Sequence, residues 1–335
     1  MSQKKRFTNK VVVVTGASAG IGRATAEAFA YEGAHIAAIS RNTERLSALE
    51  SQLRRIGVQC LIIPSDVADA DRVYAAAEMV ENELGPVDIW INNAMVSVFS
   101  PVKEMTAAEY KRVTDVTYLG VVYGTLAALK YMLPRNKGLI IQVGSALAYR
   151  GIPLQSAYCA AKHAVQGFHD SLLTELLHDK SAVKTTMVQL SAHNTPQFDW
   201  VRSRLPNKAQ PVPPVYQPEV AASAVLWAAQ HYKREHVIGF PAWKAIYGSH
   251  FFPSFADRFL AGMGYESQQT HEPKPSSDPD NLFESVPANV AAHGRFDTEA
   301  RQKDYFFEVT KHVPLNRLVA GLIVLIILLL IFATD

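Results

Sequence analysis

The sequence predicts a doubly wound α/β domain, in which helices cover both faces of a parallel sheet of about seven strands. Short apolar runs rich in β-branched residues alternate strictly with longer helical stretches over residues 11–240. That alternation is typical of parallel strands joined by crossover helices. The runs are apolar at consecutive positions, as expected of strands buried on both faces. The chain has 335 residues, 48% of them hydrophobic, and can bury such a core.

The elements follow one another at short spacing, and no internal repeat is found. The expected strands are residues 11–15, 35–40, 60–64, 89–92, 139–144, 184–190 and, closing the sheet, 237–240. The expected helices are residues 21–31, 43–56, 70–84, 107–132, 156–178 and 218–231.

Composition excludes several classes of protein. A net charge of +2 gives no broad basic field for nucleic acid. Cys60 and Cys159 fall in an expected strand and helix and form no metal-binding or disulfide pattern, which favours a reducing compartment. The first apolar run, Val11 to Val14, is too short for a secretory signal, so the folded part is expected in the cytoplasm.

The C-terminal end carries an unbroken apolar stretch from Leu318 to Ala333. It has no polar stripe, so we interpret it as a membrane helix rather than a buried core helix or a self-association helix. A removable lipid-anchor signal would need an export signal, which is absent. Lys311 and Arg317 precede the stretch, and this charge asymmetry predicts that the preceding domain lies on the cytoplasmic side of the membrane.

Four parts are therefore expected along the chain. They are the α/β domain at 1–241, an apolar extension at 242–265, a partly irregular linker at 266–312 and the membrane helix at 313–335. The extension is rich in aromatic residues, which we interpret as packing against the sheet domain. The alternative is a patch that dips into a lipid monolayer.

A glycine-rich turn links the first expected strand to the first helix. Gly16 lets the chain turn sharply, Gly20 lets the main chain approach a pyrophosphate, and Gly22 lets the helix pack closely on the sheet. The helix N-terminus adds free N–H groups and the positive end of its dipole. The turn predicts a dinucleotide site that includes Thr15, Gly16, Ser18, Gly20, Ile21 and Gly22.

The glycine spacing, TGxxxGxG, resembles that of the short-chain dehydrogenase/reductase family, over about residues 8 to 241. The resemblance implies a Rossmann-type sheet and a nicotinamide cofactor. NAD-dependent members usually end the second strand with an acid that binds the ribose, whereas this sequence has Ser40 and Arg41. A guanidinium can bind a phosphate bidentately, so NADP(H) is the expected cofactor. The alternative for Arg41 is a solvated surface side chain.

Two further segments match cofactor contacts of the family. Asp66 and Val67, after the third strand, match the pair that contacts adenine. Asn93 and Ala94, after the fourth, belong to a motif whose next residue is usually glycine, where this chain has Met95. Main chain at that point normally lies close to the cofactor, so Met95 is expected to narrow the site.

Tyr158 and Lys162 form a YxxxK motif, whose spacing puts both side chains on one face of a helix. The ammonium and a bound nicotinamide ring both favour phenolate, so together they should lower the pKa of Tyr158 from its usual ~10. Tyr158 would act as general acid in reduction and as general base in oxidation. In the family the lysine also holds the nicotinamide ribose.

The resemblance supplies two more catalytic positions. Ser145, thirteen positions before Tyr158, matches the serine that hydrogen-bonds the substrate oxygen. Thr117 stands where the family has an asparagine whose carbonyl holds a proton-relaying water. A threonine keeps that carbonyl, so the relay is expected to survive, although its hydroxyl could also bend the helix.

The segment after the sixth expected strand matches the nicotinamide and substrate region of the family. Thr195 fits the threonine that touches the nicotinamide amide, while Leu190 and Ser191 stand where Pro-Gly is usual. Residues 197–216 correspond to the substrate lid, and their apolar content favours a hydrophobic substrate over simple packing of the lid. His193 is interpreted as structural.

Together these residues predict an NADP(H)-dependent oxidoreductase acting on a carbonyl or secondary alcohol of an apolar small molecule. The competing hypothesis, motivated by Met95, Thr117 and Leu190, is a membrane-tethered sensor or scaffold that binds NADP(H) without turnover. A nucleotide-sugar epimerase or dehydratase is weaker, because those relatives usually show another glycine spacing. A homodimer or homotetramer is expected by analogy, and no metal site is expected.

Overall fold

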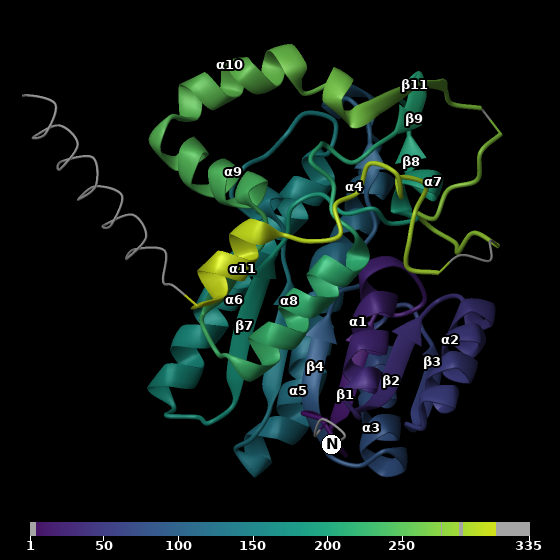
Figure 1. Cartoon of the computed structure of the whole chain (residues 1–335), viewed down its shortest axis with the longest axis vertical. Coiled ribbons are helices and arrows are strands. Elements are labelled where there is room, and N and C mark those ends of the chain that lie inside the picture. The colour runs from purple at the N-terminus through teal and green to yellow at the C-terminus, as the bar shows by residue number, and fades with distance from the viewer. Residues whose placement is uncertain (1–4, 276, 288–290, 313–335) are drawn as a thin grey trace, which may run out of the picture.

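The computed structural model describes residues 5–275, 277–287 and 291–312, and its centre is a seven-stranded sheet (Figure 1). The strand order is β10-β7-β6-β4-β1-β2-β3, and every pairing in it is parallel. The strands are β1 (Val11–Thr15), β2 (His35–Ser40), β3 (Cys60–Pro64), β4 (Val87–Asn92), β6 (Leu139–Val143), β7 (Lys184–Gln189) and β10 (Glu235–Val237). The predicted fold class is confirmed.

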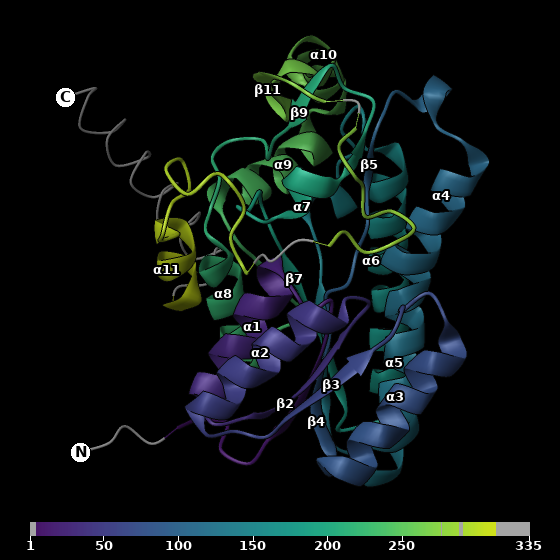
Figure 2. The ribbon, with the colours of Figure 1, turned by 90° about the vertical axis from the view of Figure 1, so that its right-hand side faces the viewer.

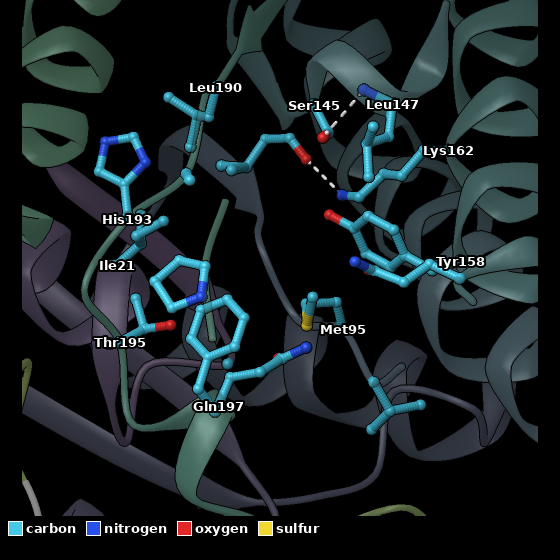
Figure 3. Close-up of a pocket in the computed structure, with 18 of the residues that line it drawn as sticks. Ile21, Met95, Ser145, Leu147, Tyr158, Lys162, Leu190, His193, Thr195 and Gln197 are labelled. Carbon is cyan, nitrogen blue, oxygen red and sulfur yellow. Dashed lines mark hydrogen bonds between the residues drawn. The ribbon is translucent and has the colours of Figure 1, made fainter. Parts of the chain in front are cut away.

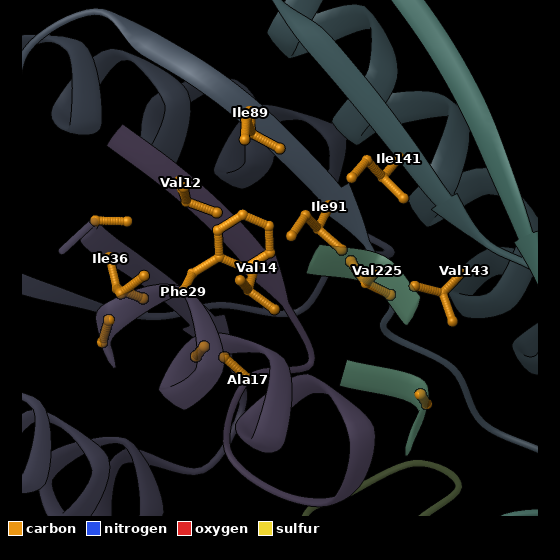
Figure 4. Packing of buried hydrophobic residues seen from close by; sticks show 14 of the residues in the cluster. Val12, Val14, Ala17, Phe29, Ile36, Ile89, Ile91, Ile141, Val143 and Val225 are labelled. Carbon is orange, nitrogen blue, oxygen red and sulfur yellow. The ribbon is translucent and has the colours of Figure 1, made fainter. Parts of the chain in front are cut away.

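Helices cover both faces of this sheet (Figure 2). One face carries α1 (Gly20–Tyr31), α2 (Thr43–Ile56) and α8 (Pro218–Gln230), and the other carries α3 (Ala70–Glu83), α5 (Gly120–Arg135) and α6 (Ser156–His178). Phe29 of α1 is fully buried among Val12, Val14 and Ile36 (Figure 4). Burying a ring of this size stabilises the fold by about 1.5–3 kcal/mol.

Helix ends follow local sequence signals. The side chain of Asn42 caps α2 by accepting a bond from the N–H of Arg45, and Gly57 ends that helix in the left-handed conformation. Thr106 and Glu109 form a capping box at the start of α4 (Ala107–Thr114). These caps explain why α2 spans Thr43–Ile56 and why α4 begins at Ala107.

Two predicted elements differ from the structure. The helix expected at 107–132 is divided into α4, a π-helical turn (Asp115–Leu119) and α5. The last strand lies earlier than the expected 237–240, because Gly239 adopts a φ of 88° and Phe240 already begins a helix. A residue in that left-handed region ends the strand.

The remaining elements lie beyond the carboxyl ends of the sheet strands, except α11, which packs beside α8 (Figures 1 and 2). They are β5 (Val98–Phe99), α7 (Gln197–Trp200), β8 (Arg202–Ser203), β9 (Asn207–Ala209), α9 (Phe240–Phe251), α10 (Pro253–Met263), β11 (Gln269–Pro273) and α11 (Tyr305–His312). Two small sheets, β5 with β8 and β9 with β11, connect these segments.

The aromatic extension does not pack as predicted. Phe251, Phe252, Phe255 and Phe259 each expose 52–72% of their surface, and no residue of α10 is buried. The interpretation of these rings as core packing is therefore wrong. The four side chains are exposed on α9, on α10 and at the junction between them, and we call this set the exposed apolar patch on α9 and α10.

The predicted membrane helix from Leu318 to Ala333 lies outside the described residues. Among the described residues, one helical stretch, Ala107–Arg135, is long and apolar enough to cross a membrane. Half of its most apolar window is buried within the protein, as in core helices of globular domains, so its length and composition are weak evidence for a membrane span.

Candidate active site

One cavity of about 730 Å³ lies at the carboxyl edge of the sheet, where the connections that follow the parallel strands β1 and β4 run to opposite faces (Figure 3). In doubly wound sheets, ligands bind in this crevice. Nearly all the predicted site residues line it: Gly16, Ser18, Gly20, Ile21, Gly22, Ser40, Arg41, Asp66, Val67, Asn93, Ala94, Ser145, Tyr158, Lys162 and Thr195. Thr15 and Thr117 do not line the cavity, but each hydrogen-bonds a residue that does.

The glycine turn is fitted closely to the end of β4. Gly16 has a φ of 68°, and a Cβ on Gly22 would lie 2.3 Å from the carbonyl oxygen of Gly16. The amide of Asn93 donates to the carbonyl of Thr15 at 2.9 Å, and the Thr15 hydroxyl accepts the N–H of Ala94 at 3.1 Å. The turn therefore has the shape that lets main chain approach a dinucleotide, and Thr15 acts by holding it.

Arg41 is not the solvated side chain of the alternative interpretation. Its guanidinium donates to the carbonyl oxygens of Phe283, at 2.9 Å, and Asn281, at 2.6 Å. Burial lowers its pKa from the ordinary value, with Asp66 opposing and Arg112 adding to the shift. Arg41 is thus a partly buried cation at the end of β2.

The other residues near the predicted adenosine end are also held in place. The hydroxyls of Ser18 and Ser40 lie 2.7 Å apart, which joins the glycine turn to the end of β2. Asp66 forms an ion pair with Arg112 and accepts the N–H of Ala68. These contacts shape a polar end of the cavity around Arg41.

Ser145, Tyr158 and Lys162 meet at the opposite end of the cavity (Figure 3). The ammonium of Lys162 donates to the carbonyl oxygen of Val143 at 2.7 Å and lies 5.7 Å from the ring centre of Tyr158. Ser145 follows β6, and its Oγ accepts the N–H of Leu147 at 3.1 Å. The strand and the helix thus bring together a hydroxyl, a phenol and an ammonium.

Among the groups of the protein itself, burial has the largest influence on the pKa values of Tyr158 and Lys162. It raises the pKa of Tyr158, and a hydrogen bond from Ser145 opposes the rise. It also lowers the pKa of Lys162 to about 8. The pKa of Tyr158 is thus raised, whereas a lowering is expected when Lys162 and a bound nicotinamide ring act together. In the protein alone, desolvation of the phenolate outweighs the contributions of the neighbouring groups.

Thr117 lies fully buried in the π-helical turn. Its hydroxyl donates to the carbonyl of Val96 at 2.9 Å and accepts the N–H of the same residue at 3.1 Å. The hydroxyl therefore does not bend its own helix. It fixes the segment that follows Met95, whose side chain lines the cavity.

Thr195 and His193 approach the cavity from the segment after β7 (Figure 3). His193 is buried, its Nδ1 lies 3.0 Å from the carbonyl of Ser191, and burial lowers its pKa to about 4. The ring is therefore neutral near pH 7, with Nδ1 as the donor to that carbonyl.

Sequence reasoning missed two groups that line the cavity. Phe259, Leu260 and Met263 come from α10, and Asn281, Ser285 and Val286 come from the segment interpreted as a linker. For the first group a signal was available: Phe255, Phe259 and Met263 are four positions apart, a spacing that places them on one face of a helix. The segment of the second group accepts hydrogen bonds from Arg41 and Arg45 through the main-chain carbonyls of Asn281, Phe283 and Val286, which no side-chain pattern reveals.

Comparison with known proteins identifies the family. The family model described as short chain dehydrogenase matches residues 10–205, which span the glycine turn, Ser145, Tyr158 and Lys162. This chain belongs to the short-chain dehydrogenase/reductase family. "Uncharacterized oxidoreductase YxnA" of Bacillus subtilis (strain 168) is 33% identical over 324 residues, which cover 95% of this chain and 90% of that protein. The chain is thus an oxidoreductase of this family.

Other relatives and solved structures agree with this membership. A "3beta-hydroxysteroid dehydrogenase" of Mediterraneibacter gnavus is 30% identical, covering 70% of this chain and 92% of that protein. A metagenomic short-chain oxidoreductase in complex with NADP aligns with a TM-score of 0.59 at 25% identity, over 69% of this chain and 97% of that one. The Thermococcus sibiricus alcohol dehydrogenase complexed with 5-hydroxy-NADP gives 0.60 at 26%, over 68% and 94%. These neighbours support a nicotinamide cofactor in the cavity.

Proposed function

We propose that this protein uses NADPH to reduce a carbonyl group of an apolar small molecule, with Tyr158 as the proton donor. The observation that supports this most is that Ser145, Tyr158 and Lys162 share one cavity with the glycine turn and Arg41. A dinucleotide bound along that turn would extend from the guanidinium at one end to the phenol at the other. Reduction is the favoured direction in a reducing cytoplasm.

A nicotinamide bound in the cavity would supply the hydride for the carbonyl carbon. Tyr158 gives its phenolic proton to the carbonyl oxygen, so that the alcohol forms as hydride arrives. Ser145 donates a hydrogen bond to the same oxygen and stabilises its developing negative charge. Lys162, held by the carbonyl of Val143, places a positive charge beside the phenol, which favours release of the proton.

The preference for NADP(H) rests on Arg41. Its guanidinium stands directly after β2, next to Ser40, and no carboxylate occupies either position. A 2′-phosphate there would gain a charge-assisted bond that a 2′-hydroxyl cannot match. The NADP and 5-hydroxy-NADP of the two solved neighbours are consistent with this choice.

An apolar substrate is favoured by the walls near Tyr158. Phe99, Leu147 and Ile152 line that part of the cavity with Leu260 and Met263 of α10. Walls of this kind favour ligands with large hydrocarbon surfaces. The hydroxysteroid dehydrogenase of Mediterraneibacter gnavus is named for a substrate of that type.

Membrane attachment would bring such a substrate to the site. The exposed apolar patch on α9 and α10 includes Phe259, which also borders the cavity. The run from Leu318 to Ala333 would tether the chain, with the catalytic domain on the cytoplasmic side. Phenylalanine rings on an amphipathic helix are suited to the interface of a bilayer.

Pairing of subunits is favoured by exposed leucines on two long helices. Leu126 and Leu133 of α5 and Leu177 of α6 each expose more than two fifths of their surface. By analogy with the family, we expect these helices to associate between subunits, so a homodimer or homotetramer is the proposed state.

The test is NADPH consumption with a panel of steroid, fatty aldehyde and aromatic ketone substrates. Tyr158→Phe should abolish consumption while leaving NADPH binding intact, and the exposed Tyr305→Phe should behave as wild type. Equal rates for wild type and Tyr158→Phe would exclude Tyr158 as the acid. Tight NADPH binding with no turnover on any substrate would favour the sensor or scaffold instead.

A further inference from the structure

Residues 280–286, which we call the strap, lie at the polar end of the cavity, in the yellow-green segment after β11 (Figures 1 and 2). Both guanidinium bonds of Arg41 go to main-chain carbonyls of the strap, those of Asn281 and Phe283. The residue expected to bind the 2′-phosphate is therefore held by a segment some 240 positions further along the chain.

Two more arginines bind the strap through its main chain. Arg112 of α4 donates from Nε to the carbonyl of Leu282 at 2.9 Å, and Arg45 of α2 donates to the carbonyl of Val286. The strap thus connects the helices on the two sides of the adenosine end. Carbonyl oxygens accept these bonds without bearing a full negative charge, so the cluster still attracts a phosphate.

The strap is anchored by its own side chains. Leu282 is fully buried and belongs to the core cluster that also contains residues of α3 and α5. Asp280 accepts a bond from Nε of Arg202 at 2.8 Å, and the N–H of Asn281 donates to the carbonyl of Trp200 at 2.9 Å. These contacts fix the strap against both the sheet domain and the substrate lid.

The strap also orients a second cation toward the same end of the cavity. The guanidinium of Arg45 lies 4.4 Å from the centre of the Trp200 ring, which restricts its rotation. Arg45, Ser285 and Val286 all line the cavity beside Arg41. Two guanidinium groups and a hydroxyl thus line the same cavity, and together they are a donor set suited to a phosphate monoester.

We propose that the strap is the outer wall of the NADP(H) site, holding Arg41 and Arg45 at the adenosine 2′-phosphate and lifting before the cofactor can leave. The inference rests on the NADP(H)-dependent function proposed above and adds a selectivity and retention element to it. NADH, which lacks the phosphate, would gain little from the two guanidinium groups.

The test measures cofactor dissociation rather than activity. Leu282→Ala removes the buried anchor of the strap, and the exposed Glu284→Ala, in the same segment, is its matched control. In stopped-flow displacement, Leu282→Ala should release NADPH at least about tenfold faster, with a smaller change for NADH. Glu284→Ala should match wild type. Hydrogen exchange of residues 280–286 in wild type, which should slow when NADPH is added, gives a second readout if Leu282→Ala fails to fold.

The outcomes separate the two proposals. If wild type binds NADPH but Leu282→Ala releases it at the wild-type rate, or binds it more tightly, the strap proposal is overturned and the proposed reaction stands. Unchanged hydrogen exchange of the strap on NADPH addition has the same meaning. If wild type binds no NADPH, the proposed function fails, and the strap proposal fails with it.

Discussion

The ammonium of Lys162 donates to the carbonyl oxygen of Val143 at 2.7 Å, so α6 and β6 are joined beside Ser145. This bond fixes the lysine at the base of the cavity, where burial lowers its pKa to about 8. The charge next to Tyr158 therefore depends on pH within an accessible range.

Activity should follow that ionisation. As pH rises through about 8, Lys162 loses its proton, and the positive charge that favours proton release from Tyr158 is lost. We expect kcat/KM for NADPH-dependent reduction to fall above this pH. In Lys162→Arg the charge persists, so the alkaline decline should move upward even if the rate is lower. A profile that declines at the same pH in both proteins would contradict the assignment to Lys162.

Ser145→Ala should lower kcat by about a hundredfold, because one preorganised donor to the substrate oxygen is lost. It should also raise the pKa of Tyr158 further, since the Ser145 hydrogen bond is the interaction that opposes the effect of burial. Steady-state kinetics of NADPH-dependent reduction measures the loss in kcat. Ser145→Thr retains the hydroxyl and should recover part of the rate.

Arg41→Ala should weaken NADPH binding about ten- to a hundredfold, which corresponds to losing a charge-assisted bond of about 1.4–2.7 kcal/mol. NADH affinity should change by much less. Fluorescence titration of both reduced cofactors measures the ratio, with Arg54→Ala, exposed on α2, as a control. Equal losses for NADPH and NADH would mean that Arg41 is structural.

Thr117→Val should lower the free energy of unfolding by about 1–3 kcal/mol, because both main-chain groups of Val96 lose a buried partner. Thr117→Ser keeps the hydroxyl and should lose less. Urea unfolding of the two variants measures the difference. Equal stability of both variants would show that the hydroxyl does not hold the segment after Met95.

Stability should fall in mild acid. Burial lowers the pKa of His169, His193 and His236 to about 4 each, below the ordinary value of 6.5. Between these values the unfolded chain takes up protons that the folded chain does not, so stability decreases as pH falls from 6.5 toward 4. Each histidine contributes up to about 1.4 kcal/mol per pH unit. Urea unfolding between pH 7 and 5 measures how steeply the free energy of unfolding changes with pH. His169→Gln removes one titrating group and should make this dependence less steep. An unchanged dependence would show that His169 does not contribute to it.

Local signals allowed most of the sheet domain to be predicted. Apolar runs and caps such as Asn42 define elements whose neighbours are close in sequence. The glycine turn, Ser145 and the YxxxK motif identified one cavity, because all of them follow or open elements at the same sheet edge. The resemblance to a known family supplied the roles of these residues.

The rest depends on contacts distant in sequence. The aromatic side chains of Phe255 and Phe259 suggested a core, and only the position of α10 at the mouth of the cavity shows them exposed. The strap carries no motif, since its carbonyls rather than its side chains contact Arg41. The pKa of Tyr158 likewise depends on how deeply the whole fold buries the phenol, which the YxxxK spacing does not encode.

The bonds from Arg41 to Asn281 and Phe283 also bear on how the protein is made. During translation, β1, β2 and the glycine turn leave the ribosome long before these partners have been synthesised. A nascent chain can therefore form its sheet early but cannot complete the adenosine end of the cavity until nearly the whole polypeptide has emerged. A chain that terminated upstream of Asn281 would leave Arg41 without both carbonyl acceptors.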